Sequence, residues 1–294
     1  MNNLAIAALA LVVIAALVIW LVRRTTWRPS APLRLVRRRS TGQIVAAVRR
    51  MYLSRVLLFI GIGLPIAVAT VLPGVATVWL TSTIQSAQGD TTTGSVLVAL
   101  ASVVLSALSP ITLSIGQAAT MFTVREIDEG RPVGPLRAYA GALRRAVPLL
   151  LTELALVVVL VLLSLTVVLL PVAAFVLVLS LLIIPVVLFE HTWGWRAFRR
   201  SGHLVRRHWL KVVVLVAFTN GLVLAIGPLL GTALILGTPL PFAVSNAVAG
   251  VVYAVFVPLV ALNAVYVYAD VTVRDELEPR ADRTPELPAE ATLV

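Results

Sequence analysis

The sequence predicts an all-α integral membrane protein with about seven transmembrane helices. Of its 294 residues, 60% are hydrophobic and only 13% are charged, whereas a soluble domain carries about 25% charged residues. The apolar residues gather in runs of 19 to 43 that are almost free of charge, and a run longer than about 18 residues indicates a membrane span. The basic residues are confined to alternate connections between these runs, as a multi-pass protein requires.

The first apolar run is predicted to form an uncleaved N-terminal anchor helix, residues 1–22. A cleaved signal peptide has its positive charges before the apolar stretch, but here Arg23 and Arg24 follow it. We therefore expect the N-terminus to lie outside the cell. Residues 23–37 are then a basic cytoplasmic linker.

A six-helix membrane domain with interfacial amphipathic helices is expected over residues 38–270. The run from residue 147 to residue 189 holds 43 residues and a single charge, Glu153, which is about twice the length that crosses a bilayer. It must therefore turn back, and Pro171 is the expected turn. The six predicted spans are residues 56–80, 95–122, 147–169, 172–189, 209–236 and 242–268.

The distribution of the 24 basic residues predicts the orientation. Ten lie between the first and second spans, five follow the third, six follow the fifth and three lie in the tail. The opposite connections, "TSTIQSAQGDTTTG", the turn at Pro171 and "GTPLP", contain none. Because positively charged connections stay in the cytoplasm, we predict a protein of the cytoplasmic (inner) membrane with its N-terminus outside and its C-terminus in the cytoplasm.

Three segments share a pattern in which an apolar residue precedes Arg-Arg and the chain then enters a span. They are "AAVRRMYLSRVLLFIGIG" (46–63), "GALRRAVPLLLTELALVV" (141–158) and "HLVRRHWLKVVVLVAFTN" (203–220). The pattern predicts three copies of one unit that follows the anchor helix: an interfacial helix, an Arg-Arg junction and a transmembrane hairpin. This alignment pairs Arg50 with Arg145 and Arg207.

The stretch "GWRAFRRSGHLVRRHWLK" (194–211) is predicted to lie in the plane of the membrane. One side of its helical wheel carries Trp195, Phe198, Gly202, Val205 and Trp209, and the other carries Arg196, Arg200, His203 and Arg207. This separation is typical of an interfacial helix, for which anionic phospholipids of the inner leaflet are the expected partners. The candidate headgroup contacts across the three copies are Arg49, Arg50, Arg144, Arg145, Arg196, Arg200, Arg206, Arg207 and Lys211.

The chain resembles a group of bacterial polytopic membrane proteins. The stretches "STGQIVAAVRRMYLSRVLLFIGIG" and "GWRAFRRSGHLVRRHWLKVVVLV", with a last span ending "NAVYVYADVTVRDE", are similar to proteins related to the membrane domain of glycerophosphoryl diester phosphodiesterases. The resemblance covers about residues 38–276, although "YADVTVRD" only loosely matches the Tyr-Asp-Leu-Arg-like motif of that family. The membrane domain is not the catalytic part of those proteins, so the resemblance implies a non-catalytic membrane domain.

Placing a polar side chain inside a membrane span costs free energy, so such residues mark candidate functional sites. The candidate intramembrane polar site is Gln117, Glu153, Asn220 and Asn263. A coupling carboxylate or a lipid-headgroup partner is one interpretation of Glu153, and an ion pair with a neighbouring arginine such as Arg55 is the other. The asparagines are expected to join helices through hydrogen bonds.

Several function classes have no support in the sequence. There is no cysteine, and the three histidines make no metal-binding motif. We expect no cofactor and no nucleic-acid partner, because membrane topology accounts for the net charge of +11. The acidic tail, residues 271–294, is predicted to be disordered, and either folds back on the basic face or contacts a protein partner.

We therefore expect a non-catalytic membrane protein whose basic cytoplasmic face binds lipid or docks a membrane or cytoplasmic partner. The alternative is a small-molecule transporter or lipid flippase that uses Glu153 and the intramembrane Asn and Gln side chains. A lipid-modifying enzyme at the inner face is a third hypothesis, and the sequence leaves the question of enzymatic activity open.

Overall fold

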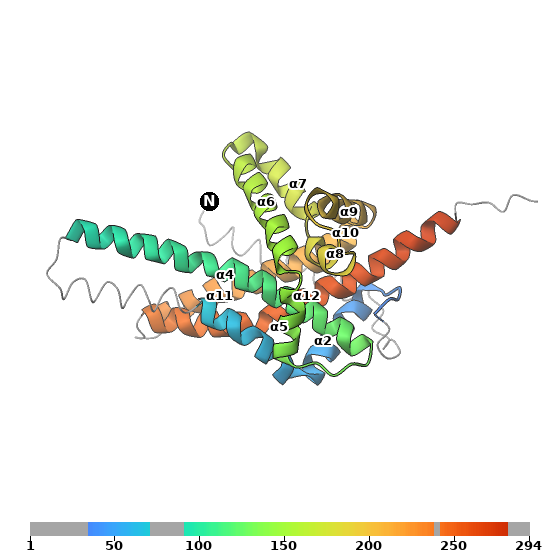
Figure 1. Ribbon diagram of the computed structural model, residues 1–294, viewed down its shortest axis with the longest axis horizontal. Coiled ribbons are helices and arrows are strands. Elements are labelled where there is room, and N and C mark those ends of the chain that lie inside the picture. The colour runs from blue at the N-terminus through green and yellow to red at the C-terminus, as the bar shows by residue number, and fades with distance from the viewer. Residues whose placement is uncertain (1–34, 71–90, 238–241, 282–294) are drawn as a thin grey trace, which may run out of the picture.

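The computed structural model describes residues 35–70, 91–237 and 242–281, and all regular elements in these ranges are helices (Figure 1). The all-α prediction is therefore confirmed for this part of the chain. The expected anchor helix, the linker up to residue 34 and the tail beyond residue 281 lie outside the described residues. The first part of the tail, residues 271–281, was predicted to be disordered but is helical, because it continues the last helix and packs against the protein through Val271 and Asp275.

The described elements come in a fixed order along the chain. Their order is α2 (Thr41–Ser54), the helix Val56–Thr70, α4 (Thr91–Asp128), α5 (Pro135–Leu143), α6 (Ala146–Ser164), the 3₁₀ turn η1 (Val167–Leu169), α7 (Leu170–Leu179), α8 (Ile183–Phe189), α9 (Gly194–Arg207), α10 (Trp209–Val212), the π-helical turn η2 (Val213–Ala217), α11 (Phe218–Gly237) and α12 (Phe242–Ala281).

Four segments among the described residues are long and apolar enough to cross a membrane. They are Ala146–Ser164, Val167–Phe189, Trp209–Gly237 and Val248–Leu277, and the bent pair Thr41–Ser54 and Val56–Thr70 is a fifth if it is counted as one span. In addition, α4 covers the expected span 95–122 with a single helix of 38 residues. A helical protein with several membrane-spanning helices is thus supported, while the number seven stays a prediction.

The last helix lies at the centre of the packing. Residues 260–271 of α12 are all buried, and α12 contacts α2, α4, α8, α9 and α11. Figure 1 shows α4, α11 and α12 side by side, with the α6–α7 hairpin diverging from them. The helix Val56–Thr70 packs tightly on α12 at Gly63, where an added Cβ would lie 2.4 Å from the carbonyl oxygen of Ala254.

The turn inside the 43-residue apolar run lies before Pro171 rather than at it. The helix α6 ends at Ser164, Thr166 has an extended backbone, and Pro171 is in the first turn of α7. Proline is well tolerated there because its missing N–H would have no partner in the first turn of a helix. Pro171 therefore starts the returning helix.

Three short helices end in the same kind of backbone break before a longer helix. The break residues are Arg55 (φ −140°, ψ 41°), Arg145 (φ −116°, ψ 8°) and His208 (φ −131°, ψ 33°). In each case the N–H of the break residue donates to the carbonyl three residues earlier, and its own carbonyl accepts from the N–H four residues later. The chain bends by 87° at Arg55.

Burial before the break is also shared. The residue seven positions before it (Val48, Ala138 or Ser201) and the residue three positions before it (Tyr52, Ala142 or Val205) are buried in all three copies. The breaks differ from the predicted alignment of Arg50, Arg145 and Arg207. Arg49 and Arg50 lie inside α2 and the first break is five residues later, at Arg55, while the third is one residue later, at His208. Arginine is a good helix former, so an Arg-Arg pair does not itself end a helix.

Candidate functional site

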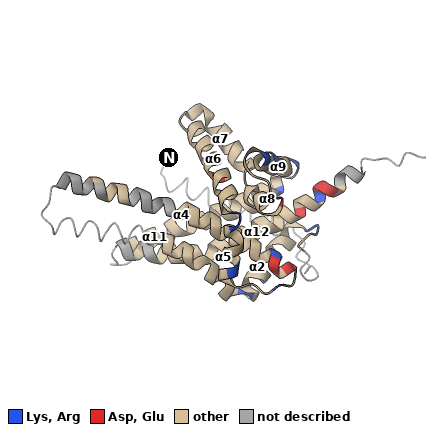
Figure 2. Ribbon diagram, in the orientation of Figure 1, with Lys and Arg blue, Asp and Glu red and all other residues tan. Residues whose placement is uncertain are grey.

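The charged side chains of the described residues gather where α2, α5 and α9 meet the ends of α4, α8 and α12 (Figure 2). We call this region the basic end. Glu153, in the middle of α6, is an exception. The basic end contains three clusters of ion pairs and one open surface.

The first cluster surrounds Asp270 of α12, which is fully buried. Its carboxylate accepts from the backbone N–H of Arg39, from the ammonium of Lys211 and, at 3.0 Å, from Nε of Arg274. Lys211 also donates to the carbonyl of Arg39 at 2.6 Å. The segment before α2 is thereby bound to α10 and α12.

This cluster gives Lys211 and Arg39 internal partners. Lys211, a predicted headgroup contact, has only 17% of its side chain exposed and pairs with Asp270. The guanidinium of Arg39 is buried, lies 5.1 Å from the ring centre of Tyr266 and donates to the carbonyl of Leu35. Both cations hold the fold together in this structure.

The second cluster surrounds Asp275, near the end of α12. Its carboxylate accepts from Arg200 at 2.8 Å and from Arg207 at 3.0 Å, and lies 3.1 Å from Nε2 of His203. Arg200 also bonds Glu190, which accepts from the hydroxyl of Tyr268 at 2.9 Å. One face of α9 is therefore paired with carboxylates of α8 and α12.

The third cluster surrounds Glu126, a buried carboxylate at the end of α4. Arg131 donates to it at 2.6 Å, and Arg137 lies 3.2 Å from its second oxygen. The hydrogen bond from Arg131 is the main reason that the pKa of Glu126 lies below its ordinary value of 4.5. Glu126 thus joins α4 to the start of α5.

The depressed pKa of Glu126 predicts a pH-dependent stability. The stabilisation is fully present above the ordinary pKa and is lost as the pH falls through the lower folded-state pKa. Glu126→Gln is therefore expected to unfold at a lower temperature than the unmodified protein at pH 7, and this difference should shrink below about pH 4. Thermal unfolding in non-ionic detergent at several pH values measures it. Glu129→Gln, in a half-exposed ion pair, is the control and should show a small difference at every pH.

Six of the nine predicted headgroup contacts have no ion pair with a carboxylate in the part of the chain that the structure describes. They are Arg49, Arg50, Arg144, Arg145, Arg196 and Arg206. The other three, Arg200, Arg207 and Lys211, are paired within the protein. The structure therefore divides the predicted headgroup contacts into arginines without a carboxylate partner among the described residues and basic residues that form ion pairs within the protein.

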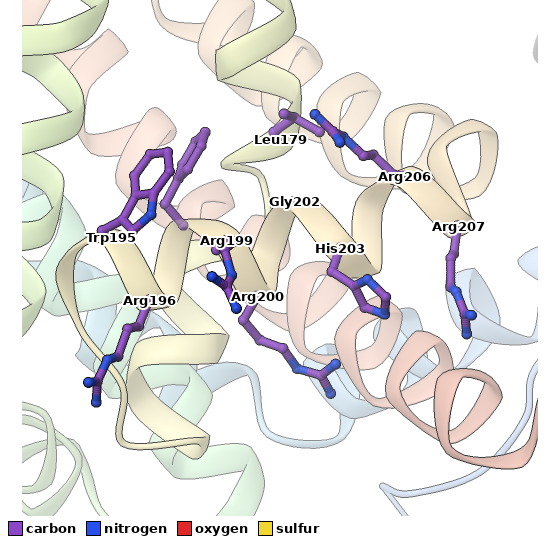
Figure 3. A pocket seen from close by; sticks show the side chains of 10 residues that line it. Leu179, Trp195, Arg196, Arg199, Arg200, Gly202, His203, Arg206 and Arg207 are labelled. Carbon is purple, nitrogen blue, oxygen red and sulfur yellow. The ribbon is translucent and has the colours of Figure 1, made fainter. Parts of the chain in front are cut away.

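An open hollow of about 750 Å³ lies along the exposed face of α9 (Figure 3). Its cationic lining includes Arg196, Arg199 and Arg206, and its apolar lining includes Trp195 and Leu179. In Figure 3, Arg206 extends toward Leu179, while Arg196, Arg200, His203 and Arg207 extend to the opposite side of the helix. The guanidinium of Arg206 lies 5.7 Å from the ring centre of Phe175 on α7.

The position of α9 is fixed by two further hydrogen bonds. The N–H of Gly194, which adopts φ 61°, donates to the hydroxyl of Thr152 at 2.9 Å, and the hydroxyl of Ser201 donates to the carbonyl of Leu179 at 2.7 Å. Glycine accommodates that left-handed backbone without a steric cost. The hollow is therefore built on a helix that α6 and α7 hold in place.

Part of the apolar side of α9 is exposed on the surface, and part of it is buried against the rest of the protein. Trp195 and Trp209 are 72% and 60% exposed, as expected for side chains that face lipid. Gly202 and Val205, predicted to lie on the same side, are buried instead. The helical wheel could not show this difference, because it does not contain α7.

The predicted intramembrane polar residues have separate partners among the described residues. Glu153 of α6 lies near the hydroxyl of Ser114 on α4. Asn263 of α12 donates to the carbonyl of Leu215 and, at 2.9 Å, to the hydroxyl of Thr219, while Asn220 donates to Val216 within its own helix. No hydrogen bond joins any two of the four, counting Gln117, within the described residues.

Arg199, Asp270 and Asp275 are absent from the predicted site residues. On the helical wheel of residues 194–211, Arg199 lies between the apolar side and the basic side, so the wheel alone gives no reason to select it. Asp270 follows the last apolar run and is a plausible boundary residue, but its partner Lys211 is 59 residues away. Such a pairing requires the helix packing, so no local pattern could have found it.

The described residues contain no group of three His, Cys, Asp or Glu side chains that could hold a metal ion. Comparisons with protein-family models, curated proteins and solved structures give no match to this chain. What the outward arginines can do chemically follows from their geometry. Guanidinium groups beside exposed tryptophans can bind phosphate groups at a membrane interface.

Proposed function

We propose that this protein is a non-catalytic, multi-pass protein of the cytoplasmic membrane whose basic end binds anionic phospholipids of the inner leaflet. One observation carries the proposal. Arg196, Arg199 and Arg206 face outward without a carboxylate ion pair among the described residues, on the same helix as the exposed Trp195. Such a surface matches a layer of phosphate groups above acyl chains.

The energetics favour lipid over water at this surface. Each basic residue near an anionic leaflet contributes about 1 kcal/mol, and tryptophan side chains are stabilised at the boundary between headgroups and acyl chains. Arg49 and Arg50 of α2 and Arg144 before α6 add further exposed cations. The bend of 87° between α2 and the following helix is consistent with α2 lying along the membrane surface while its neighbour crosses the membrane.

The resemblance to the membrane domain of glycerophosphoryl diester phosphodiesterases agrees with this proposal, because that domain is not the catalytic part. The expected topology agrees as well. With the N-terminus outside, the basic end faces the cytoplasm, where anionic lipids attract basic residues. A protein partner that docks on the basic end would compete with these lipids.

The proposal predicts a selective, salt-sensitive association with anionic lipid. The full chain in non-ionic detergent is mixed with equal amounts of phosphatidylglycerol and phosphatidylcholine of the same acyl chains, repurified, and its retained lipid is quantified by mass spectrometry. Phosphatidylglycerol should be enriched at about 0.1 M NaCl and much less at about 1 M, where the Debye length falls from about 10 to about 3 Å. Equal retention of the two lipids at low salt would refute the proposal, as would a cytoplasmic location of a reporter fused after Gly89.

A further inference from the structure

We propose that the hollow on α9 is a binding site for one anionic glycerophospholipid molecule. Its phosphate lies between Arg199 and Arg206, and one acyl chain follows the apolar wall made by Trp195, Phe198 and Leu179. The inference rests on the proposed function and deepens it, because it replaces a diffuse attraction at the basic end with one defined site.

Both arginines start from the same side of the helix, but in Figure 3 the side chain of Arg206 extends toward Leu179 and that of Arg199 extends away from it. Arg199 and Arg206 are seven residues apart, which is two helical turns or about 10 Å along the axis. Both line the hollow, with Gly202 between them. Leu179 covers Gly202, so a phosphate in the hollow lies beside that leucine and can receive charge-assisted hydrogen bonds from both arginines.

Some basic side chains of α9 are paired with a carboxylate of the protein, whereas Arg199 and Arg206 remain available to bind an external anion. Arg200, His203 and Arg207 lie against the carboxylate of Asp275, which supplies their counter-charge from within the protein. Arg199 and Arg206 have no carboxylate ion pair among the described residues, and no acidic residue lines the hollow. An anion from outside the described residues can therefore pair with them.

The apolar wall indicates an amphiphile. Trp195 stacks on Phe198 with ring centres 5.4 Å apart, and Leu179 closes the side toward α7. The guanidinium of Arg206 lies over the ring of Phe175, which leaves its edge free to donate to a phosphate. A hollow of about 750 Å³ is far larger than one phosphate group, so the remaining volume suits glycerol and the first part of an acyl chain.

The site is held in position before a lipid arrives. Gly194 and Ser201 attach α9 to α6 and α7, and Arg200 attaches it to α8 and α12. Little ordering of the helix is then needed when a lipid binds, and this preorganisation favours affinity. The ion pairs of the Asp275 cluster thus support the site without touching the lipid.

The test measures the affinity of the first phosphatidylglycerol molecule for the full chain in non-ionic detergent by native mass spectrometry. The double substitution Arg199→Ala, Arg206→Ala should weaken this first binding step about 30-fold. The matched control is Arg37→Ala, Arg38→Ala, which removes the same charge from exposed positions before α2 and should weaken it less than about threefold. Thermal unfolding of both variants verifies that the fold is kept.

Three outcomes would overturn the site. If the two double variants lose affinity equally, binding is diffuse and only the proposed function stands. If the unmodified protein does not prefer phosphatidylglycerol to phosphatidylcholine, both proposals fail. If inorganic phosphate at millimolar concentration displaces the lipid completely, the apolar wall has no role and the hollow binds free phosphate.

Discussion

Asp270→Ala is expected to lower the free energy of unfolding by about 3–5 kcal/mol, the usual cost of removing one partner from a buried ion pair. Asp270 is fully buried and accepts from Arg39, Lys211 and Arg274. Its removal leaves the ammonium of Lys211 in a largely buried position and the N–H of Arg39 without its acceptor. Asp270→Asn, which keeps one carbonyl oxygen for that N–H, should lose less.

Denaturant unfolding of the purified protein in non-ionic detergent measures these losses. Glu129→Ala is the control, since its ion pairs with Arg125 and Arg131 are partly exposed and such pairs contribute at most about 1 kcal/mol. A double-mutant cycle with Lys211→Ala separates the ion pair from general damage, because coupled residues deviate from additivity by about 0.5–3 kcal/mol. If the effects of Asp270→Ala and Lys211→Ala simply add, the pairing described here is wrong.

Gly63→Ala is expected to destabilise the protein by about 1–3 kcal/mol, the typical cost of forcing an extra methyl group into a packed interior. The added Cβ would lie 2.4 Å from the carbonyl oxygen of Ala254. A backbone atom in the middle of α12 cannot move aside as a flexible side chain can. The helix Val56–Thr70 would have to separate from α12, which loses contacts around buried Phe59 and Ile62.

The matched control for this change is Gly221→Ala in α11. A Cβ at Gly221 would meet nothing within 4 Å, and alanine is favoured over glycine inside a helix by about 1 kcal/mol. Gly221→Ala should therefore be neutral or stabilising in the same unfolding measurement. Equal destabilisation by both substitutions would contradict the close packing of Gly63 against α12.

The parts of the fold that depend on local pattern could be predicted from the sequence. Runs of apolar residues are sufficient to identify membrane-spanning helices, and the amphipathic pattern of residues 194–207 is sufficient to identify α9. A break between an interfacial helix and a span starting at residue 56 could also be predicted, but its position could not: the Arg-Arg pattern places the junction at Arg50, whereas α2 continues to Ser54 and the break is at Arg55.

The candidate site shows the same limit. The arginines of α9 were visible in the sequence, but their division into two groups was not. Whether a cation faces outward depends on the position of a carboxylate 68 to 75 residues away, as for Asp275 with Arg207 and Arg200. The separation of Glu153 from Asn263 likewise follows from which helices pack together.

The bond between the N–H of Arg39 and Asp270 joins residues 231 positions apart, and this sets an order in the synthesis of the protein. The ribosome must have made nearly the whole chain before the acceptor for this N–H exists. The N–H of Arg39 therefore lacks this acceptor while the helices before α12 are inserted, although Leu35 of the same segment can already donate to Asp128 at the end of α4. A chain that stops before residue 270 lacks this attachment at its beginning, far from the site of truncation.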